Sequence, residues 1–178
     1  GKTGLALAVA EKFGGTIINS DSMQVYRELR VVTARPSAAE ENRAPHKLYG
    51  ILPATERCSA VRWLEMAVRE IEAAWRAKRR PIVVGGTGLY IKALLSGLSE
   101  IPSVPEDVRG AARTTYDAIG AGAFHARLAG VDPAAAARLP ETDTQRLLRA
   151  YEVYMATGKS LSDWHREAPA TKPLSADV

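Results

Sequence analysis

The chain has 178 residues, 46% hydrophobic and 25% charged, which is the composition of an ordinary soluble domain that buries a sizeable core. It contains no apolar run of about 18 residues and no signal-peptide pattern, so we expect a cytoplasmic protein that does not enter a membrane. The formal net charge of +4 suits an anionic partner, while a single cysteine (Cys58) and three scattered histidines exclude an internal disulfide and a zinc-ligand pattern.

The first predicted element is an amphipathic helix that starts at Lys2. Apolar residues recur four positions apart at Leu5, Val9 and Phe13, and a glycine pair then ends the pattern. The apolar segment TIIN at 16–19 follows directly, and we expect it to form a short buried strand. The chain thus opens with a helix followed by a strand.

A second helix and a second strand are predicted further along. Ser59 is a suitable N-cap for an amphipathic helix whose apolar positions continue to Trp75. The apolar segment PIVV at 81–84 predicts another buried strand, and the glycine-rich turn after it leads into a helix that closes near Gly97. This alternation of helices and apolar strands predicts an α/β fold with a parallel sheet, and we assign residues 1–102 to it.

After residue 102 the pattern is helical only. The expected helices cover about 104–118, 121–129, 133–139 and 143–157. We therefore predict a helical insertion over 103–165. The Pro-rich residues 166–178 are expected to be a linker that returns towards the core.

The first three residues, Gly1, Lys2 and Thr3, match the end of the phosphate loop G-x-x-x-x-G-K-[ST]. In such a loop, backbone N–H groups and a helix N-terminus surround the anion, the lysine spans the phosphates, and the threonine hydroxyl binds magnesium. Thr3 is thus the candidate Mg²⁺ ligand. The first glycine of the motif and the strand before it are not in the sequence, so we expect the chain to carry only the second half of the loop.

Polar groups follow both predicted strands. Asp21 comes directly after the first strand, and Thr87 lies in the glycine turn after the second. The carboxyl ends of parallel strands meet at one edge of a sheet, where α/β proteins bind ligands. We expect Asp21 to be a base or a metal-orienting group there; the alternatives are a turn-forming aspartate and an ordinary glycine turn.

In the helical part, Gln145 and Arg149 are four residues apart, and Arg146 lies beside them. Glutamine and arginine are suited to hydrogen-bond base edges and phosphates of an RNA loop, and Arg109 allows the same interpretation. The alternative is that these side chains are ordinary solvated residues. Leu147 and Leu148 are expected on the packing side of this helix.

Four segments in this order resemble the tRNA dimethylallyltransferases. They are GKT at 1–3, DSMQVYR at 21–27, VGGTGLYIKALL at 84–95 and QRLLRAYEVYMATGKSLS at 145–162. The resemblance implies a P-loop NTPase-like parallel sheet core with an inserted helical subdomain. It also implies transfer of a dimethylallyl group from dimethylallyl diphosphate to N6 of the adenosine adjacent to the anticodon in tRNA, with Mg²⁺ as cofactor. The implied partners are the tRNA anticodon stem-loop and the prenyl donor, with no membrane, and a monomer is expected.

Roles follow from the resemblance position by position. The diphosphate-binding residues it implies are Gly1, Lys2, Thr3 and Arg35. The residues it places at the reacting centre are Asp21, as general base, Thr87 and Arg109. The residues it implies for tRNA contact are Asp21, Ser22, Met23, Gln24, Gln145, Arg146, Leu147, Leu148 and Arg149. Around Arg35 the chain has VVTARP where the family commonly has I-G-T-A-K-P, so the positive charge is kept but the local backbone differs.

Three other functions are compatible with parts of this pattern. An adenylate isopentenyltransferase uses the same core on free AMP, ADP or ATP. A small P-loop kinase shares the G-K-T helix and an aspartate after a strand. A catalytically inactive RNA-binding fragment is the third possibility.

Overall fold

A computed structural model of the chain describes residues 1–167, 173 and 174. They form two compact units, one of residues 1–98 with 173 and 174, and one of residues 99–167. The linker predicted over 166–178 lies mostly outside the described residues.

The first unit is built on a parallel sheet, as predicted. Its described strands are β1 (Gly15–Asn19), β2 (His46–Lys47) and β3 (Arg80–Val84), in the order β2-β1-β3. Its helices are α1 (Lys2–Phe13), α2 (Ala38–Glu41), α3 (Ala60–Arg76) and α4 (Gly88–Ser96). The predicted helices at Lys2, after Ser59 and before Gly97, and the strands at 16–19 and 81–84, are all confirmed.

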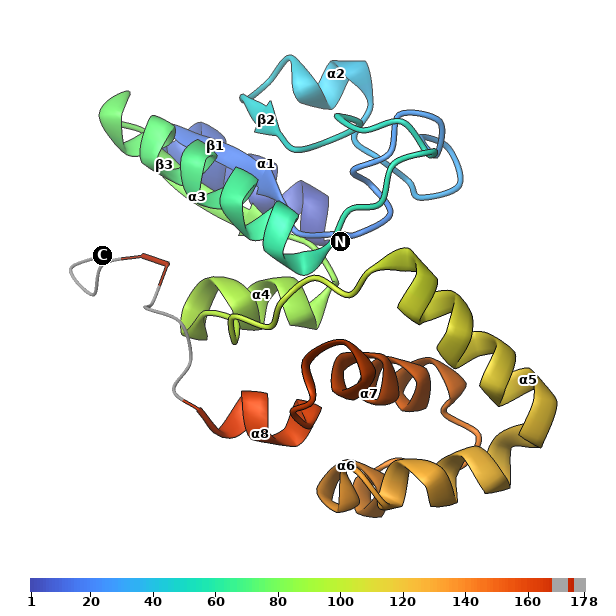
Figure 1. Ribbon diagram of the computed structural model, residues 1–178. Helices are drawn as coiled ribbons and strands as arrows, with labels where there is room; N and C mark the ends of the chain where they lie inside the picture. The colour runs from blue at the N-terminus through green and yellow to red at the C-terminus, as the bar shows by residue number, and fades with distance from the viewer. Residues whose placement is uncertain (168–172, 175–178) are drawn as a thin grey trace. The chain divides into compact units, whose positions relative to one another are not determined.

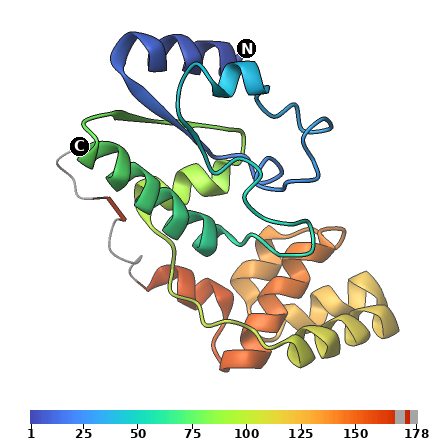
Figure 2. The ribbon, with the colours of Figure 1, turned by 90° about the horizontal axis from the view of Figure 1, so that it is seen from above.

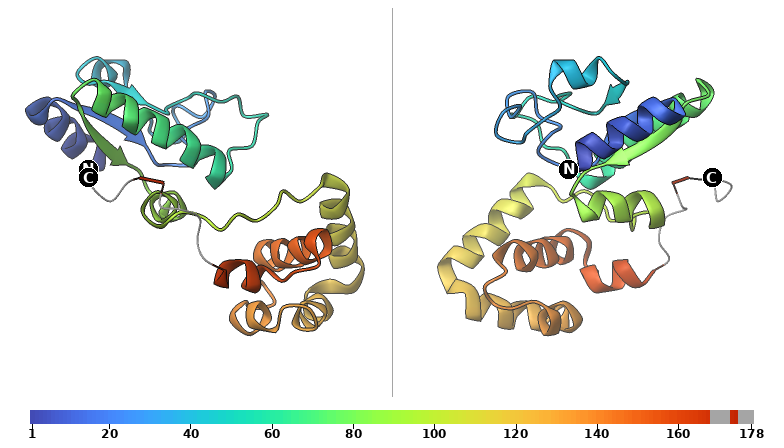
Figure 3. Two further views of the ribbon diagram at one scale, coloured as in Figure 1. Left: turned by 60° about the vertical axis from the view of Figure 1, so that its left-hand side comes forward. Right: turned by 180° about the vertical axis from the view of Figure 1, so that it is seen from behind.

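Helices α1 and α3 lie on opposite faces of the sheet (Figures 1 and 3). Successive side chains of a strand point to opposite faces, and β1 shows this directly. Ile17 packs in a cluster with Leu7 of α1, whereas Ile18 packs in a cluster with Trp63 and Ile71 of α3. Because both faces are covered, every residue of β1 is buried, as the continuous apolar segment predicts.

Local signals explain where the long helices begin and end. Ser59 Oγ accepts a hydrogen bond from Arg62 N–H and caps α3 at the predicted residue. Helix α1 ends at Gly14, whose φ of 64° is readily adopted only by glycine.

Helix α2 and strand β2 were not expected from the sequence. Helix α2 has a complete capping box, in which Ser37 and Glu40 each accept a hydrogen bond from the other's backbone N–H. The pattern S-x-x-E was therefore a usable signal. Strand β2 has only two residues, and it is defined by pairing with Ile17 and Ile18 of β1, so no local periodicity could reveal it.

The second unit is helical, as predicted. It contains α5 (Glu106–Ala129), α6 (Pro133–Arg138), α7 (Thr144–Thr157) and α8 (Leu161–Arg166), of which only α8 was not expected. These helices pack on one another around a shared apolar core (Figure 2). The break predicted between 118 and 121 is a kink at Gly120, whose φ is 77°.

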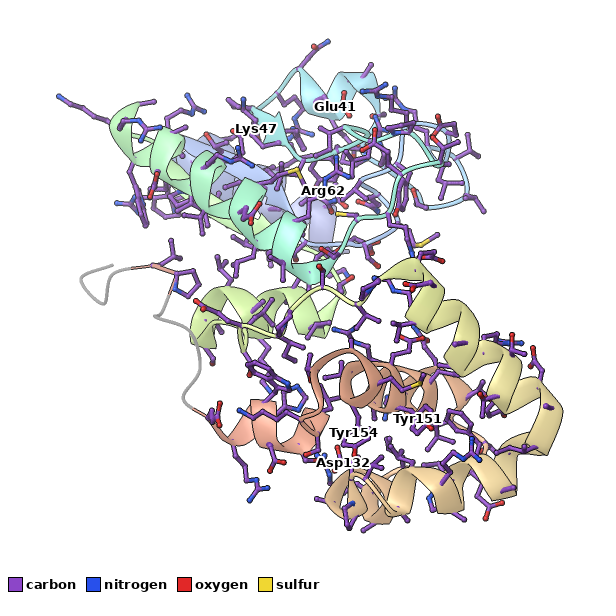
Figure 4. The ribbon with its side chains drawn as sticks, viewed as in Figure 1. Glu41, Lys47, Arg62, Asp132, Tyr151 and Tyr154 are labelled. Carbon is purple, nitrogen blue, oxygen red and sulfur yellow. The ribbon has the colours of Figure 1, made fainter. Side chains whose placement is uncertain are left out.

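Asp132 connects two helices of this unit from a buried position (Figure 4). Its Oδ1 accepts a hydrogen bond from Ala135 N–H of α6 at 2.9 Å, and its Oδ2 accepts one from Ser162 N–H of α8 at 3.0 Å. A buried carboxylate is tolerated when hydrogen bonds replace its hydration. Asp132 therefore fixes the start of α6 against α8.

Candidate active site

The carboxyl ends of β1 and β3 are joined by hydrogen bonds that continue beyond the strands. Ser20 N–H donates to Val84 O at 2.8 Å, and Thr87 N–H donates to Ser20 O at 3.1 Å. The Thr87 hydroxyl accepts a hydrogen bond from Ser22 N–H at 2.9 Å. The two segments that follow the strands are therefore held together, as the parallel topology predicts.

The glycine turn after β3 allows this close approach. A Cβ atom on Gly85 would lie 2.2 Å from the carbonyl carbon of Ser20, so no side chain fits there. A Cβ atom on Gly86 would lie 3.3 Å from Lys2 Nζ and 3.8 Å from Asp21 Oδ2. An ammonium group and a carboxylate oxygen therefore converge on the same side of Gly86.

The two oxygens of the Asp21 carboxylate have different environments. Oδ1 accepts hydrogen bonds from Met23 N–H at 2.9 Å and Gln24 N–H at 3.4 Å, which is the turn-forming role. Oδ2 has no hydrogen-bond partner within the described part of the chain. Burial raises the pKa of the nearby Tyr49 phenol to about 12, with smaller contributions from the charges of Asp21 and Glu41. One oxygen of Asp21 thus shapes the turn, and the other is available to a ligand.

Lys2 and Thr3 lie in the first turn of α1, where backbone N–H groups and the helix dipole attract anions. Gly1 occupies the N-cap position and makes no side-chain cap hydrogen bond. The Lys2 side chain is exposed, and no described carboxylate lies within ion-pairing distance of it. This end of α1 therefore combines free N–H groups, a cation and the Thr3 hydroxyl.

Arg35 is directed into the protein. Its side chain is 10% exposed, lies against Gly50, donates weakly to Tyr26 O at 3.5 Å and is 3.9 Å from Glu41 of α2. Gly50 has a φ of 55° and a Cβ there would overlap the guanidinium, so Arg35 occupies space that only glycine leaves. The Arg35 guanidinium is thus largely buried, its Nε has no hydrogen-bond partner among the described residues, and its role as a diphosphate ligand stays a prediction.

Gln24 and Met23, two of the residues for which tRNA contact is implied, differ in accessibility. Gln24 Nε2 donates to Thr33 O at 2.7 Å, so this amide nitrogen holds the loop that follows. Met23 is 49% exposed. Of these two side chains, Met23 is the more accessible to a flat apolar ring.

In the second unit, Arg109 of α5 lies close enough to Arg149 of α7 to affect the pKa of Arg149. Burial lowers the pKa of the Arg149 guanidinium, Glu152 opposes this, and the positive charge of Arg109 lowers the pKa further. Arg109 forms an ion pair with the exposed Glu106 at 3.3 Å. Two guanidinium groups of like charge are thus held near one another, which favours an anion between or beside them.

The predicted RNA-contacting segment of α7 divides into exposed and buried residues. Gln145 and Arg146 are exposed, and Arg146 pairs with Asp143 at 3.3 Å. Leu147 and Leu148 are buried in the core of the helical unit, on the packing side as expected. Leu147 is fully buried and Leu148 is 9% exposed, so the tRNA contact that the resemblance implies for these two leucines stays a prediction.

Asn19, the last residue of β1, was not among the predicted site residues. Its side chain is fully buried and hydrogen-bonds both the N–H and the C=O of Asp21. A buried asparagine at the end of an otherwise apolar strand was the signal that could have identified it.

Two features bear on metal and membrane binding. The described residues contain no group of three or more His, Cys, Asp or Glu side chains that could hold a metal ion. A Mg²⁺ ion at the start of α1 would have the Thr3 hydroxyl as its ligand from the protein and would take its other ligands from a diphosphate and water, which is a common mode for this ion. Among these same residues, no helix is long and apolar enough to cross a membrane.

Comparison with known proteins places the chain in a family. Residues 24–177 match the family model described as IPP transferase. The tRNA dimethylallyltransferase of Rhodospirillum centenum is 56% identical over 173 residues, which cover 97% of this chain and 55% of that protein. The enzyme of the same name from Paramagnetospirillum magneticum is 53% identical and is covered to 53%. The chain thus spans about half the length of the curated relatives it matches.

Solved structures agree with this. A eukaryotic dimethylallyltransferase acting on tRNA matches 94% of this chain, and 42% of that chain is covered, with 29% identity and a TM-score of 0.77. The tRNA delta(2)-isopentenylpyrophosphate transferase of Staphylococcus epidermidis matches 92% of this chain and is covered to 53%, with 35% identity and a TM-score of 0.54. With a parallel sheet flanked by helices, a helical unit, and a family model that matches most of its length, this chain belongs to the IPP transferase family.

Proposed function

We propose that the protein transfers a dimethylallyl group from dimethylallyl diphosphate to N6 of the adenosine adjacent to the anticodon in tRNA. The observation that carries the proposal is the convergence of Lys2 Nζ and Asp21 Oδ2 on Gly86, at the strand ends next to the start of α1. The names of the relatives support the same reaction and the same RNA.

In this reaction the bond between the dimethylallyl C1 and the diphosphate oxygen breaks, and a bond from C1 to adenine N6 forms. Negative charge grows on the departing diphosphate. We propose that Lys2 and the first-turn N–H groups of α1 bind that diphosphate, because a cation and free amide donors stabilise growing negative charge. Magnesium, when bound through Thr3 and the diphosphate, supplies further charge neutralisation.

Adenine N6 is a weak nucleophile and must lose a proton as the new bond forms. We propose that Asp21 Oδ2 accepts this proton, since its partner Oδ1 is already used by two backbone amides. The Thr87 hydroxyl, which accepts a hydrogen bond from Ser22 N–H, holds the Asp21 segment against the glycine turn. In this proposal Asp21 is the general base and Thr87 orients the segment that carries it.

The helical unit is proposed to bind the RNA. The exposed Gln145 and Arg146, together with Arg149 and Arg109, provide amide and guanidinium groups that suit phosphates and base edges. Moving the target base out of its stack costs a few kcal/mol, by analogy with base-flipping enzymes, and these contacts would offset that cost. A monomeric state and a cytoplasmic location stay predictions.

The test is a transfer assay on the complete gene product that contains these residues. The protein is incubated with dimethylallyl diphosphate, Mg²⁺ and one of three acceptors: an anticodon stem-loop RNA, the same RNA with guanosine at the target position, or AMP. Prenylated adenosine is measured by mass spectrometry after digestion. We expect product only with the first RNA.

Other outcomes of this assay separate the alternatives. Product with AMP and none with RNA would identify an adenylate isopentenyltransferase. Phosphoryl transfer from ATP without any prenylated product would identify a kinase. Binding of the stem-loop RNA without product would identify an inactive RNA-binding protein, and each of these three results overturns the proposal.

A further inference from the structure

Asn19 makes an unusual set of hydrogen bonds for a residue at the end of a buried strand. Its Oδ1 accepts from Asp21 N–H at 2.9 Å, and its Nδ2 donates to Asp21 O at 3.0 Å. Nδ2 also donates to Leu48 O at 3.0 Å. One primary amide thus holds the backbone of Asp21 by both its N–H and its C=O.

Asn19 is itself anchored to the core of the first unit. Its backbone carbonyl accepts a hydrogen bond from Trp63 Nε1 of α3 at 2.8 Å, and Trp63 is fully buried. The Trp63 ring stacks on Tyr90 of α4, with centroids 4.4 Å apart and ring planes 10° apart. The backbone of Asp21 is therefore connected through Asn19 to two helices.

The contact with Leu48 adds a second connection. Leu48 is buried and has a φ of 64°, a left-handed conformation that is uncommon for leucine. Such strain persists where surrounding contacts hold it, and such sites are often functional. The Asn19 Nδ2 bond to Leu48 O is one of these contacts, so the loop after β2 and the Asp21 segment share a single side chain.

We propose that Asn19 is a positioning residue for Asp21: its amide fixes the peptide of Asp21 so that Oδ2 stays beside Gly86, where Lys2 Nζ also lies. This inference rests on the proposed function, in which Asp21 is the base. Only a primary amide of this length offers one acceptor and two donors to these three backbone groups. Aspartate keeps the acceptor and the shape but loses both donors, and alanine loses all three bonds.

The experiment measures transfer kinetics of Asn19→Ala and Asn19→Asp in the complete gene product. We expect kcat to fall about 10- to 100-fold, because small errors in the position of a catalytic group carry costs of this size. The KM values for the RNA and for the prenyl donor should change less than about threefold, because the contacts with both substrates remain.

A matched control separates positioning from loss of stability. Ile71 is 2% exposed and belongs to the core cluster of the same unit that contains Trp63. Ile71→Val removes one methylene from this core without changing a residue of the site. Thermal unfolding is measured for all variants, and kcat is compared at a temperature at which each is folded. We expect Ile71→Val to keep wild-type kcat.

The double variant Asn19→Ala/Asp21→Ala supplies a second readout. If Asn19 acts through Asp21, the double variant transfers about as slowly as Asp21→Ala alone. Losses that multiply, or a wild-type kcat in folded Asn19→Ala, would overturn the inference while the proposed function stands. Failure of the wild-type protein to prenylate RNA would instead overturn the proposed function, so the two failures are distinct.

Discussion

Replacing Gly85 by alanine tests whether the site depends on close contact between two backbones. The new Cβ atom would lie 2.2 Å from the carbonyl carbon of Ser20, 2.4 Å from its oxygen and 2.5 Å from its Oγ. The backbone after β1 or β3 must move, and overpacking of this kind costs about 1–3 kcal/mol. The movement would also break the Thr87–Ser20 and Ser22–Thr87 hydrogen bonds, each worth about 1 kcal/mol. We expect a total destabilisation of about 3–5 kcal/mol.

The same turn contains two matched controls. A Cβ atom on Gly86 would lie 3.3 Å from the movable end of Lys2 and in ordinary contact with Asp21 Oδ2 at 3.8 Å, so Gly86→Ala should cost less than about 1 kcal/mol but lower prenyl transfer. A Cβ atom on Gly88 meets nothing within 4 Å, and Gly88→Ala should leave stability unchanged or slightly raised. Urea unfolding of the three variants measures the free energies. Equal stability of Gly85→Ala and Gly88→Ala would refute the argument.

Three further results are expected. Asp21→Asn keeps an oxygen for the amides of Met23 and Gln24 but cannot accept a proton. We therefore expect kcat to fall about 100-fold or more while RNA affinity stays nearly unchanged. Equal losses of kcat and RNA affinity would show that Asp21 mainly holds substrate. Arg149→Ala should weaken RNA binding about tenfold, or about 1.4 kcal/mol, in a filter-binding assay. Arg113 is already paired with Asp117, so Arg113→Ala should have little effect on RNA binding. Similar losses of RNA affinity for both variants would contradict a specific role of Arg149. The pKa of Tyr49 is raised to about 12 in the folded protein, against about 10 in the unfolded chain. The contribution of the neutral Tyr49 phenol to the free energy of unfolding is therefore complete below about pH 10 and is lost as the pH rises from about 10 to about 12. Tyr49→Phe should therefore flatten the decline of stability over that range, and an unchanged slope would refute this.

Much of the framework followed from local patterns. Burial of one face of a helix requires apolar residues at helical spacing, which located the helix at Lys2 and the helix after Ser59. Burial of both faces of a strand requires a continuous apolar segment, which located β1 and β3. Parallel pairing then places the groups after each strand at one edge, so the meeting of the Asp21 and Thr87 segments was also predictable.

Arg35 and the two leucines of α7 show where such inference ends. A motif indicates which residue types are present but not where their side chains point. The Arg35 side chain points into the protein and occupies the space that glycine leaves open at position 50. Leu147 and Leu148 lie within an RNA-contacting motif by resemblance, yet their burial serves the core of the helical unit. Packing decides which side chains of a motif reach the surface.

The sequence by itself determined most of the helices, the two longer strands and the residue types that gather at the carboxyl ends of those strands, because these depend on periodicity and on parallel topology. Only the tertiary structure decided how Asp21 is held. Asn19 binds a carbonyl 29 positions away at Leu48 and an indole 44 positions away at Trp63, and both contacts depend on how distant loops close. Hydrogen bonds of this range leave no local pattern in the sequence, since their geometry exists only after the sheet and α3 have packed.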